Sequence, residues 1–270
     1  MQLPKVPRST PLLGLLSVLS ACGGGVPLLH PAHVLPEGRT AFAVGVSDRL
    51  VLGDEQRALD DARQRTPGAP ANDPRYGRGV LVALTEGPAV APYVSARAGL
   101  PGSNEVGLSY SGQSLRADAR HAFDWGSSAF SAGLGVTGRG LGQSAFDVPD
   151  TDLSHARAIG ADLPLLFGYR TDADLISVWG GLRGSVDHWS GTLTLDPAAP
   201  YQLNANRWAA GPVLGLALGL PPLWVAAELE VDYAHVTGTL DRAGSGAGGS
   251  LGADVNGWSA RPAGSLIAKF

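Results

Sequence analysis

Hydrophobic and polar residues alternate along most of the chain, and the pattern is clearest between Trp208 and His235. From Leu223 to Tyr233 the odd positions are apolar, whereas the even positions include three acids. Successive side chains of a β-strand point to opposite faces, so this segment predicts a strand with one apolar and one acidic face. The stretch before it alternates large residues with glycine and alanine. We predict an antiparallel hairpin turning at Pro221-Pro222, because glycines and prolines in this stretch weaken a helix.

Strands that are apolar on one face and polar or small on the other are the unit of a membrane β-barrel. The same alternation recurs along the chain, so we expect an all-β fold: one antiparallel, up-and-down transmembrane β-barrel over residues 38–270. About ten strands fit the pattern, and eight to twelve are compatible with it. The expected strands are 40–47, 90–100, 105–111, 115–123, 129–137, 155–169, 175–189, 208–220, 223–235 and 258–270.

The connections alternate between short turns and long loops, as in membrane barrels, where the short turns face the periplasm. The long loops are expected at 48–88, 138–154, 190–206 and 238–257, and the turn at 111–114 is a short exception on the long-loop side. Within the first long loop, Glu55–Arg65 predicts a short helix with Leu59 and Ala62 beneath it. Residues 80–85 predict a further strand or an extension of the next. Pro164 predicts a β-bulge, because proline cannot donate to a strand ladder.

Outward-facing aromatic residues fall near the two ends of the expected strands. Such rings form belts where a barrel meets the lipid headgroups. The long-loop belt is expected to contain Tyr110, Trp208, Tyr233 and Trp258, and the short-turn belt Phe42, Phe123, Phe130, Phe167, Tyr169 and Phe270.

Inward-facing positions carry charges of both signs. The predicted lumen network contains Arg97, Arg116, Asp118, Arg120, Asp162, Arg183, Glu228, Glu230 and Asp232, with Glu105, Asp187, Arg261 and Lys269 facing the same way. Buried charges need partners, so similar numbers of each sign predict paired side chains across a narrow bore. Trp179 and Trp224 also point inward, opposite the inward glycines 211, 215 and 219. We therefore expect a closed lumen.

Composition narrows the possible functions. The net charge of −4 and the absence of a basic tract argue against a nucleic-acid partner. No metal-spaced Cys/His cluster or phosphate-binding loop is present, so no cofactor or metal is predicted. The mean hydropathy of +0.06 lies between those of soluble and helical membrane proteins.

The N-terminus has a positive start at Lys5 and Arg8, a short apolar run at 12–19, and then Leu19-Ser20-Ala21-Cys22 followed by glycines. This order resembles the signal and lipobox of bacterial lipoproteins. The resemblance implies a signal peptide over 1–21, cleavage before Cys22, acylation of Cys22 by the lipoprotein-processing machinery, and anchoring in membrane lipid. Residues 22–37 would then form a tether, which their glycines and prolines favour. An ordinary secretory signal cleaved elsewhere is the alternative.

The chain ends on Phe270, with Ala268 and Leu266 on the same face. This end resembles the C-terminal signature that the outer-membrane barrel assembly machinery recognises. An even strand number would place both ends at the short-turn side, where a lipidated Cys22 belongs.

Four functions remain open. We favour an outer-membrane β-barrel lipoprotein with a structural role or a binding role of its surface loops. A small channel for ions or solutes is the second. A rim enzyme is the third, because His155, His188 and His235 lie near the long-loop ends of strands, although omptin and lipid A-modifying arrangements are absent. A tethered lipocalin-like barrel is the fourth. We expect no enzymatic activity, and the ligand stays open.

Overall fold

The computed structural model describes residues 26–64, 73–87, 90–140, 152–196, 199–242 and 250–270. Eleven strands and two helices make up this part of the chain. The strands are β1 (Thr40–Ser47), β2 (Leu50–Leu52), β3 (Ala91–Leu100), β4 (Asn104–Ser111), β5 (Ser114–Trp125), β6 (Ser128–Gly140), β7 (Asp152–Arg170), β8 (Ile176–Asp196), β9 (Ala199–Leu220), β10 (Leu223–Arg242) and β11 (Ser250–Lys269). The helices are α1 (Asp54–Arg63) and α2 (Pro74–Glu86).

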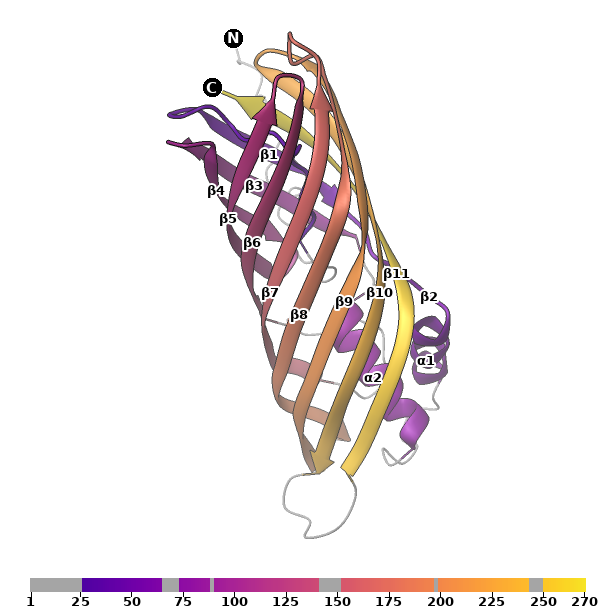
Figure 1. The fold of residues 1–270 in the computed structure, drawn as a ribbon. Coiled ribbons are helices and arrows are strands. Elements are labelled where there is room, and N and C mark those ends of the chain that lie inside the picture. Colours follow the sequence, from indigo (N-terminus) through magenta and orange to yellow (C-terminus); the bar gives the residue numbers. More distant parts are fainter. Residues whose placement is uncertain (1–25, 65–72, 88–89, 141–151, 197–198, 243–249) are drawn as a thin grey trace, which may run out of the picture.

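Ten of these strands form a closed antiparallel ring in sequence order, β1 and β3 to β11 (Figure 1). The ring closes between β1 and β11, where Ala41 pairs with Lys269 and Ser47 with Ala263. Thr40 and Phe270 complete this seam, because each backbone N–H donates to the other residue's carbonyl. The three-residue β2 continues β1 along β11. The predicted up-and-down β-barrel is therefore confirmed.

The strands differ in length, so the two ends of the ring differ. β1 and β3 to β6 contain 8 to 13 residues, whereas β7 to β11 contain 19 to 22. Short turns lie at one end (101–103, 126–127, 171–175 and 221–222), which we call the short-turn end. At the other, the long-loop end, β7 to β11 run past their neighbours (Figure 1). The turn at 112–113 is short, as expected on this side.

Part of the last two expected loops, 190–206 and 238–257, is strand. Residues 190–196 extend β8, 199–206 extend β9, and 238–242 and 250–257 extend β10 and β11. In this strand extension the alternation is reversed: Leu193, Leu203 and Leu240 face inward, whereas Gln202 and Asn204 face outward. The polar outer face made these segments resemble loops.

Two helices follow β2, where one was predicted. α1 has Leu59 and Ala62 on its buried side, as predicted. The predicted strand at 80–85 is wrong, since these residues belong to α2. Asp73 caps α2 by accepting a hydrogen bond from the Arg75 N–H (2.9 Å), Pro74 occupies its first turn, and Gly87 ends it in a left-handed conformation.

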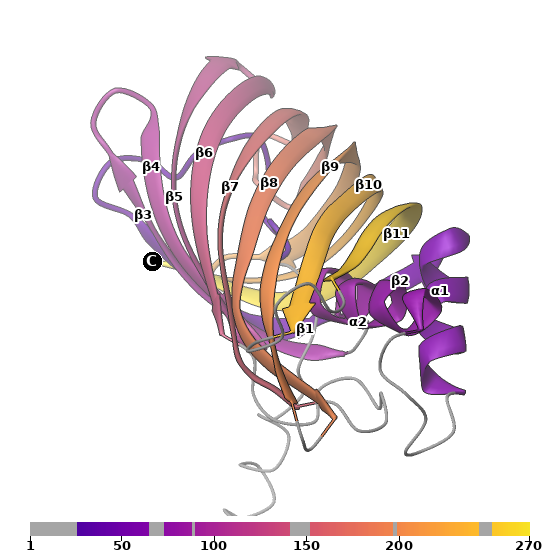
Figure 2. The same cartoon turned by 90° about the horizontal axis from the view of Figure 1, so that it is seen from below.

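The helices cover the inner side of the strand extension (Figure 2). One apolar core joins residues of α1 and α2 with Trp189, Leu193, Leu203, Leu240, Leu251 and other inward residues of the extension. Val80 to Leu84 are all buried, because α2 lies between this wall and α1. An enclosed helix is apolar all round, and a short apolar run of that kind resembles a buried strand.

Inward and outward faces follow the predicted alternation in every strand of the ring. On β10, for example, Leu223, Val225 and Leu229 are exposed, whereas Glu228 and Glu230 are buried. The predicted bulge at Pro164 is wrong. Pro164 faces inward and pairs with Arg183 of β8, and the β6–β7 register is the same on both sides of it, from Gly135↔Asp162 to Ala132↔Leu165.

No helix in the described ranges is long and apolar enough to cross a membrane.

Candidate functional site: the filled lumen

Residues 26–37 lie inside the ring and not outside it as a free tether. Val26, Leu28, Leu29 and Ala32 are buried in a second apolar core, together with Trp179, Trp224 and other inward residues of the wall. We call residues 26–37 the N-terminal plug. The predicted tether is corrected for these residues, because Val26, Leu28 and Leu29 pack on apolar wall residues inside the lumen.

Charged wall residues hold the backbone of the plug. The Glu228 carboxylate accepts hydrogen bonds from the N–H groups of Leu28 (2.8 Å) and Leu29 (2.9 Å), and from Nε1 of Trp179 (3.1 Å). Arg183 donates to the Val26 carbonyl (2.9 Å), and Arg120 donates to the carbonyls of Pro31 and His33. Backbone N–H and C=O groups of a short segment without secondary structure thus find partners in the barrel interior.

All nine residues of the predicted lumen network are buried and face inward. Eight of them are ion-paired, and Glu228 instead binds the plug. The pairs alternate in sign around the bore: Glu105–Arg97, Arg97–Asp118 (2.5 Å), Asp118–Arg116 (2.6 Å), Arg116–Asp162 (2.8 Å), Asp162–Arg183 (3.2 Å), Arg183–Glu230 (3.1 Å), Glu230–Arg261 (2.5 Å) and Arg261–Asp232 (3.2 Å). Glu105 also holds Arg120 at 2.8 Å.

The ion-pair network also includes residues that were not predicted to belong to it. Arg207 of β9 pairs with Glu86 at the end of α2, and Glu86 pairs with Arg49 at 3.0 Å. Burial alone would raise the pKa of Glu86, but Arg207 and Arg49 outweigh it and lower the pKa to about 2. These residues were missed because Glu86 and Arg49 lie in the first expected long loop, and Arg207 borders another expected loop.

Large inward side chains occupy the space left by inward glycines, as predicted. A side chain at Gly215 would collide with the ring of Trp179, and one at Gly219 with Trp224. Both tryptophans are buried. The described lumen therefore contains the plug towards the short-turn end, the ion-paired network, and α2 at the long-loop end.

The outer surface of the ring carries the predicted aromatic residues. At the long-loop belt, Tyr233 lies between Trp208 (ring centroids 6.0 Å apart) and Trp258 (5.3 Å). Tyr110 lies half-buried near the same end of β4. At the short-turn end, Phe42 contacts Phe270 (6.4 Å), Phe123 stacks on Phe130 (6.3 Å), and Phe167 and Tyr169 are exposed on β7.

Between the belts the outer surface is apolar, and beyond the tryptophans it turns polar. Leu214, Leu216, Leu218 and Leu220 of β9 are exposed on the near side of Trp208, whereas Asn206, Asn204 and Gln202 are exposed beyond it. Of the three candidate histidines, His155 and His188 lie beyond the tryptophans, whereas His235 is paired with Trp208 across the strands and contacts its ring (5.6 Å). His155 is exposed, His188 is hydrogen-bonded to Asn206 (3.0 Å), and His235 lies within 3.5 Å of Asp254. In the described ranges no three His, Cys, Asp or Glu side chains are placed to hold a metal ion.

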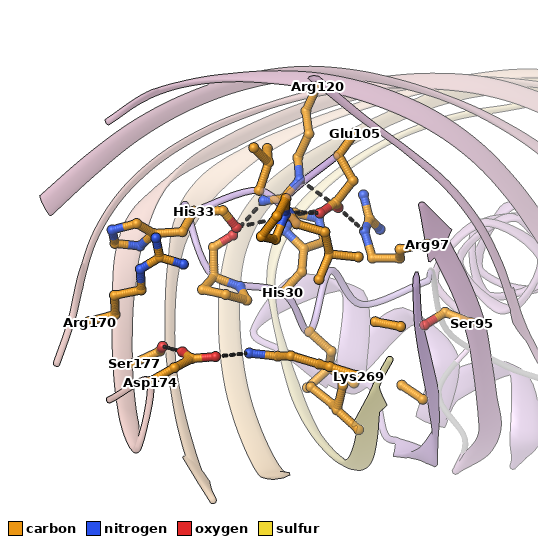
Figure 3. Close-up of a pocket in the computed structure, with 18 of the residues that line it drawn as sticks. His30, His33, Ser95, Arg97, Glu105, Arg120, Arg170, Asp174, Ser177 and Lys269 are labelled. Carbon is orange, nitrogen blue, oxygen red and sulfur yellow. Dashed lines mark hydrogen bonds and ion pairs between the residues drawn. The ribbon is translucent and has the colours of Figure 1, made fainter. Parts of the chain in front are cut away.

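A cavity of about 550 Å³ lies between the plug and the short-turn end of the wall. Arg97, Glu105 and Arg120 line one side of it, and Lys269 and Asp174 form an ion pair (2.7 Å) on another (Figure 3). His30 and His33 of the plug border it. Burial, and then the nearby Arg120, keeps the pKa of His30 well below its usual range. Burial, and then Arg170, lowers the pKa of His33. This cavity was not predicted, because the plug that forms it was expected outside the barrel.

Cys22 and the signal segment lie outside the described residues. No protein-family model matches the chain, and comparison with curated proteins finds no match. Among solved structures, similarity extends to Neisserial surface protein A (11% identity, 87% of this chain and 100% of that chain, TM-score 0.34). It also extends to Ail of Yersinia pestis (10%, 87% and 99%, 0.33) and a major outer membrane protein of Thermus thermophilus (14%, 86% and 99%, 0.35). These similarities are too distant to carry an argument about function.

Proposed function

We propose that the chain is an outer-membrane β-barrel lipoprotein with a closed lumen, which acts structurally or binds partners through its long-loop end. The observation that carries this proposal is the apolar outer band between the two aromatic belts. Leu223 and Tyr233 are ten residues apart on β10. That separation is about 33 Å along a strand and about 25 Å along the membrane normal at a tilt of about 40°. An outward apolar band of about 25 Å is the height found in outer-membrane barrels.

The strand extension, in which the alternation is reversed, supports a ring that spans the membrane with its long-loop end in water. Its outer face is polar and its inner face packs on α2, as expected for a sheet that stands in water beyond the membrane. The outward apolar face of the ring between the belts disfavours the lipocalin-like alternative, in which the apolar face of the ring would point inward.

The filled lumen supports a structural or surface-binding role over a channel. Ten strands enclose a bore only slightly wider than that of eight-stranded barrels, whose interiors side chains can fill. Here the plug, the ion pairs and α2 all occupy it. The three rim histidines point away from the lumen, so the proposal assigns no reaction to them.

Membrane insertion is tested by fractionating bacteria that express the full chain. The protein should remain with the outer membrane after carbonate extraction, and detergent should release it. Release by carbonate alone would overturn the proposal of a membrane-spanning barrel.

Lipidation is tested separately by metabolic labelling with a fatty acid. The wild type should be labelled, and Cys22→Ala should not be, while the variant barrel still resists carbonate. Equal labelling of both chains would overturn the lipoprotein part of the proposal and leave the barrel part standing.

A further inference from the structure

The cavity beside the plug has the size and lining of a small-molecule site. Its volume of about 550 Å³ falls within the range of about 300–1,000 Å³ that is typical of ligand pockets. Leu29, Leu35 and Ile267 give it apolar walls, and a few polar groups converge on it. It lies at the short-turn end, because the turns at 126–127 and 171–174 form part of its rim.

The charges around the cavity leave one cation without an acidic partner. Arg97 and Arg120 share Glu105, and Lys269 is paired with Asp174. Arg170, in contrast, makes no ion pair within the described ranges. Its guanidinium lies beside His33 at the edge of the cavity (Figure 3). The remaining lining acid, Asp172, accepts a hydrogen bond from the Ser127 hydroxyl (3.3 Å).

His30 adds a buried polar group without a partner. Its side chain is 3% exposed, and neither ring nitrogen has a hydrogen-bond partner in the structure. A neutral imidazole offers one N–H donor and one acceptor nitrogen, and a buried polar group left unpaired is unfavourable. A group bound in the cavity would satisfy it.

We propose that this cavity binds a small organic carboxylate with an apolar body, whose carboxylate lies at Arg170 and whose body lies against Leu29, Leu35 and Ile267. A guanidinium favours a carboxylate because it presents paired N–H donors to both oxygens. The apolar walls favour a ring or short chain over an inorganic anion. Nothing in this proposal depends on the membrane location or on lipidation.

The probe is 4-fluorobenzoate, and its neutral counterpart 4-fluorobenzamide is the matched control. Both are titrated by ¹⁹F NMR against the full chain in lipid nanodiscs, with empty nanodiscs as the blank. We expect line broadening of the benzoate that saturates, and at least tenfold weaker binding of the benzamide. Equal binding of the two probes, or no binding of the benzoate at millimolar concentration, would overturn the proposal.

Variants locate the site. Arg170→Gln should weaken benzoate binding at least tenfold, whereas Arg57→Gln, an exposed arginine on α1, should leave it unchanged. Ala43→Leu, which places a larger side chain in the cavity wall, should abolish binding without removing a charge. Unchanged binding in either Arg170→Gln or Ala43→Leu would contradict the assignment, and the second variant provides this test if the first does not fold.

Discussion

Outward side chains of β9 change from amide to leucine along one face, with Trp208 at the boundary. Leu214 is 62% exposed in the apolar band, and Asn204 is exposed on the same face of the strand extension. In water this arrangement would expose a row of large apolar groups, whereas in lipid each residue is in a suitable environment.

Leu214→Arg and Asn204→Arg place the same charge on the same face at two depths. An arginine near the bilayer midplane costs about 2–4 kcal/mol, and one in water costs little. We therefore expect a free energy of unfolding lowered by about that amount for Leu214→Arg and within about 0.5 kcal/mol of wild type for Asn204→Arg. Urea titration in phospholipid vesicles measures both. A similar loss in the two variants would mean that Leu214 does not face lipid.

Glu228 is the residue on which the plug depends most directly. Glu228→Ala would leave the N–H groups of Leu28 and Leu29 and the indole of Trp179 buried without an acceptor, at about 1–3 kcal/mol for each orphaned donor. We expect a marked fall in the urea midpoint and faster proteolysis within the plug. Glu37→Ala, an exposed acid on the same segment, is the control. A urea midpoint equal to that of the control would show that the hydrogen bonds of Glu228 to the plug do not stabilise the protein.

The face of each residue could be predicted from the sequence, and its neighbours around the bore could not. Period-two alternation places Arg116 and Asp162 in the lumen, but their contact joins β5 to β7 across an intervening strand. That contact depends on ring closure and side-chain length, which alternation does not encode. At Pro164 the predicted bulge is absent, because a proline that faces inward and pairs with β8 fits into the strand without one.

At the scale of elements, α2 was missed although the sequence contains its boundaries. Asp73-Pro74 is a typical helix start and Gly87-Pro88 a typical stop. The apolar run between Val80 and Leu84 favoured a strand, since its amphipathic period is hidden when both faces are buried. The plug was missed for a related reason, because its prolines and the glycines that precede it resemble a linker wherever the segment lies.

α1 contains a buried acid that should make the packing of the helices pH-dependent. Glu55 lies against Gly257 of β11, and neither of its carboxylate oxygens has a hydrogen-bond partner. Burial, and then the nearby Glu86, raises the pKa of Glu55 to about 8 from its ordinary 4.5. Asp232 also raises this pKa, whereas Arg207 and Arg49 lower it without offsetting the rise.

Because the folded state holds this proton more tightly than the unfolded state, its stabilising effect is full below about pH 4.5 and is lost as the pH rises through about 8. Glu55→Gln keeps the shape without the charge, so its urea midpoint should fall less than that of the wild type between pH 6 and pH 9. Glu37→Gln should behave like the wild type. Parallel declines in all three proteins would exclude Glu55 as the titrating group.

At the scale of the whole molecule, the barrel is a filled cylinder. Plug, ion pairs and α2 follow one another from the short-turn end to the long-loop end, and each uses wall residues of several strands. Closure of the ring by Thr40 and Phe270 places the start of β1 and the end of β11 together, as an even number of ring strands requires.

This packing predicts poor conduction. In planar bilayers the purified full chain should show no steady open level, because the plug, the ion pairs and α2 occupy the bore. Glu228→Ala should show brief openings more often than the wild type, since it loosens the plug. Steady, porin-like steps from the wild type would favour the channel alternative.

The most direct test of the account is the environment of outward positions on one strand. Spin labels are attached at Leu229→Cys and Thr239→Cys, both on the outer face of β10, in a Cys22→Ser background reconstituted in phospholipid vesicles. If residue 229 faces lipid and residue 239 faces water, oxygen, which concentrates in lipid, should relax the label at 229 more strongly than a water-soluble nickel chelate does, and the order should reverse at 239. A label at 229 that is relaxed mainly by the nickel chelate would contradict it.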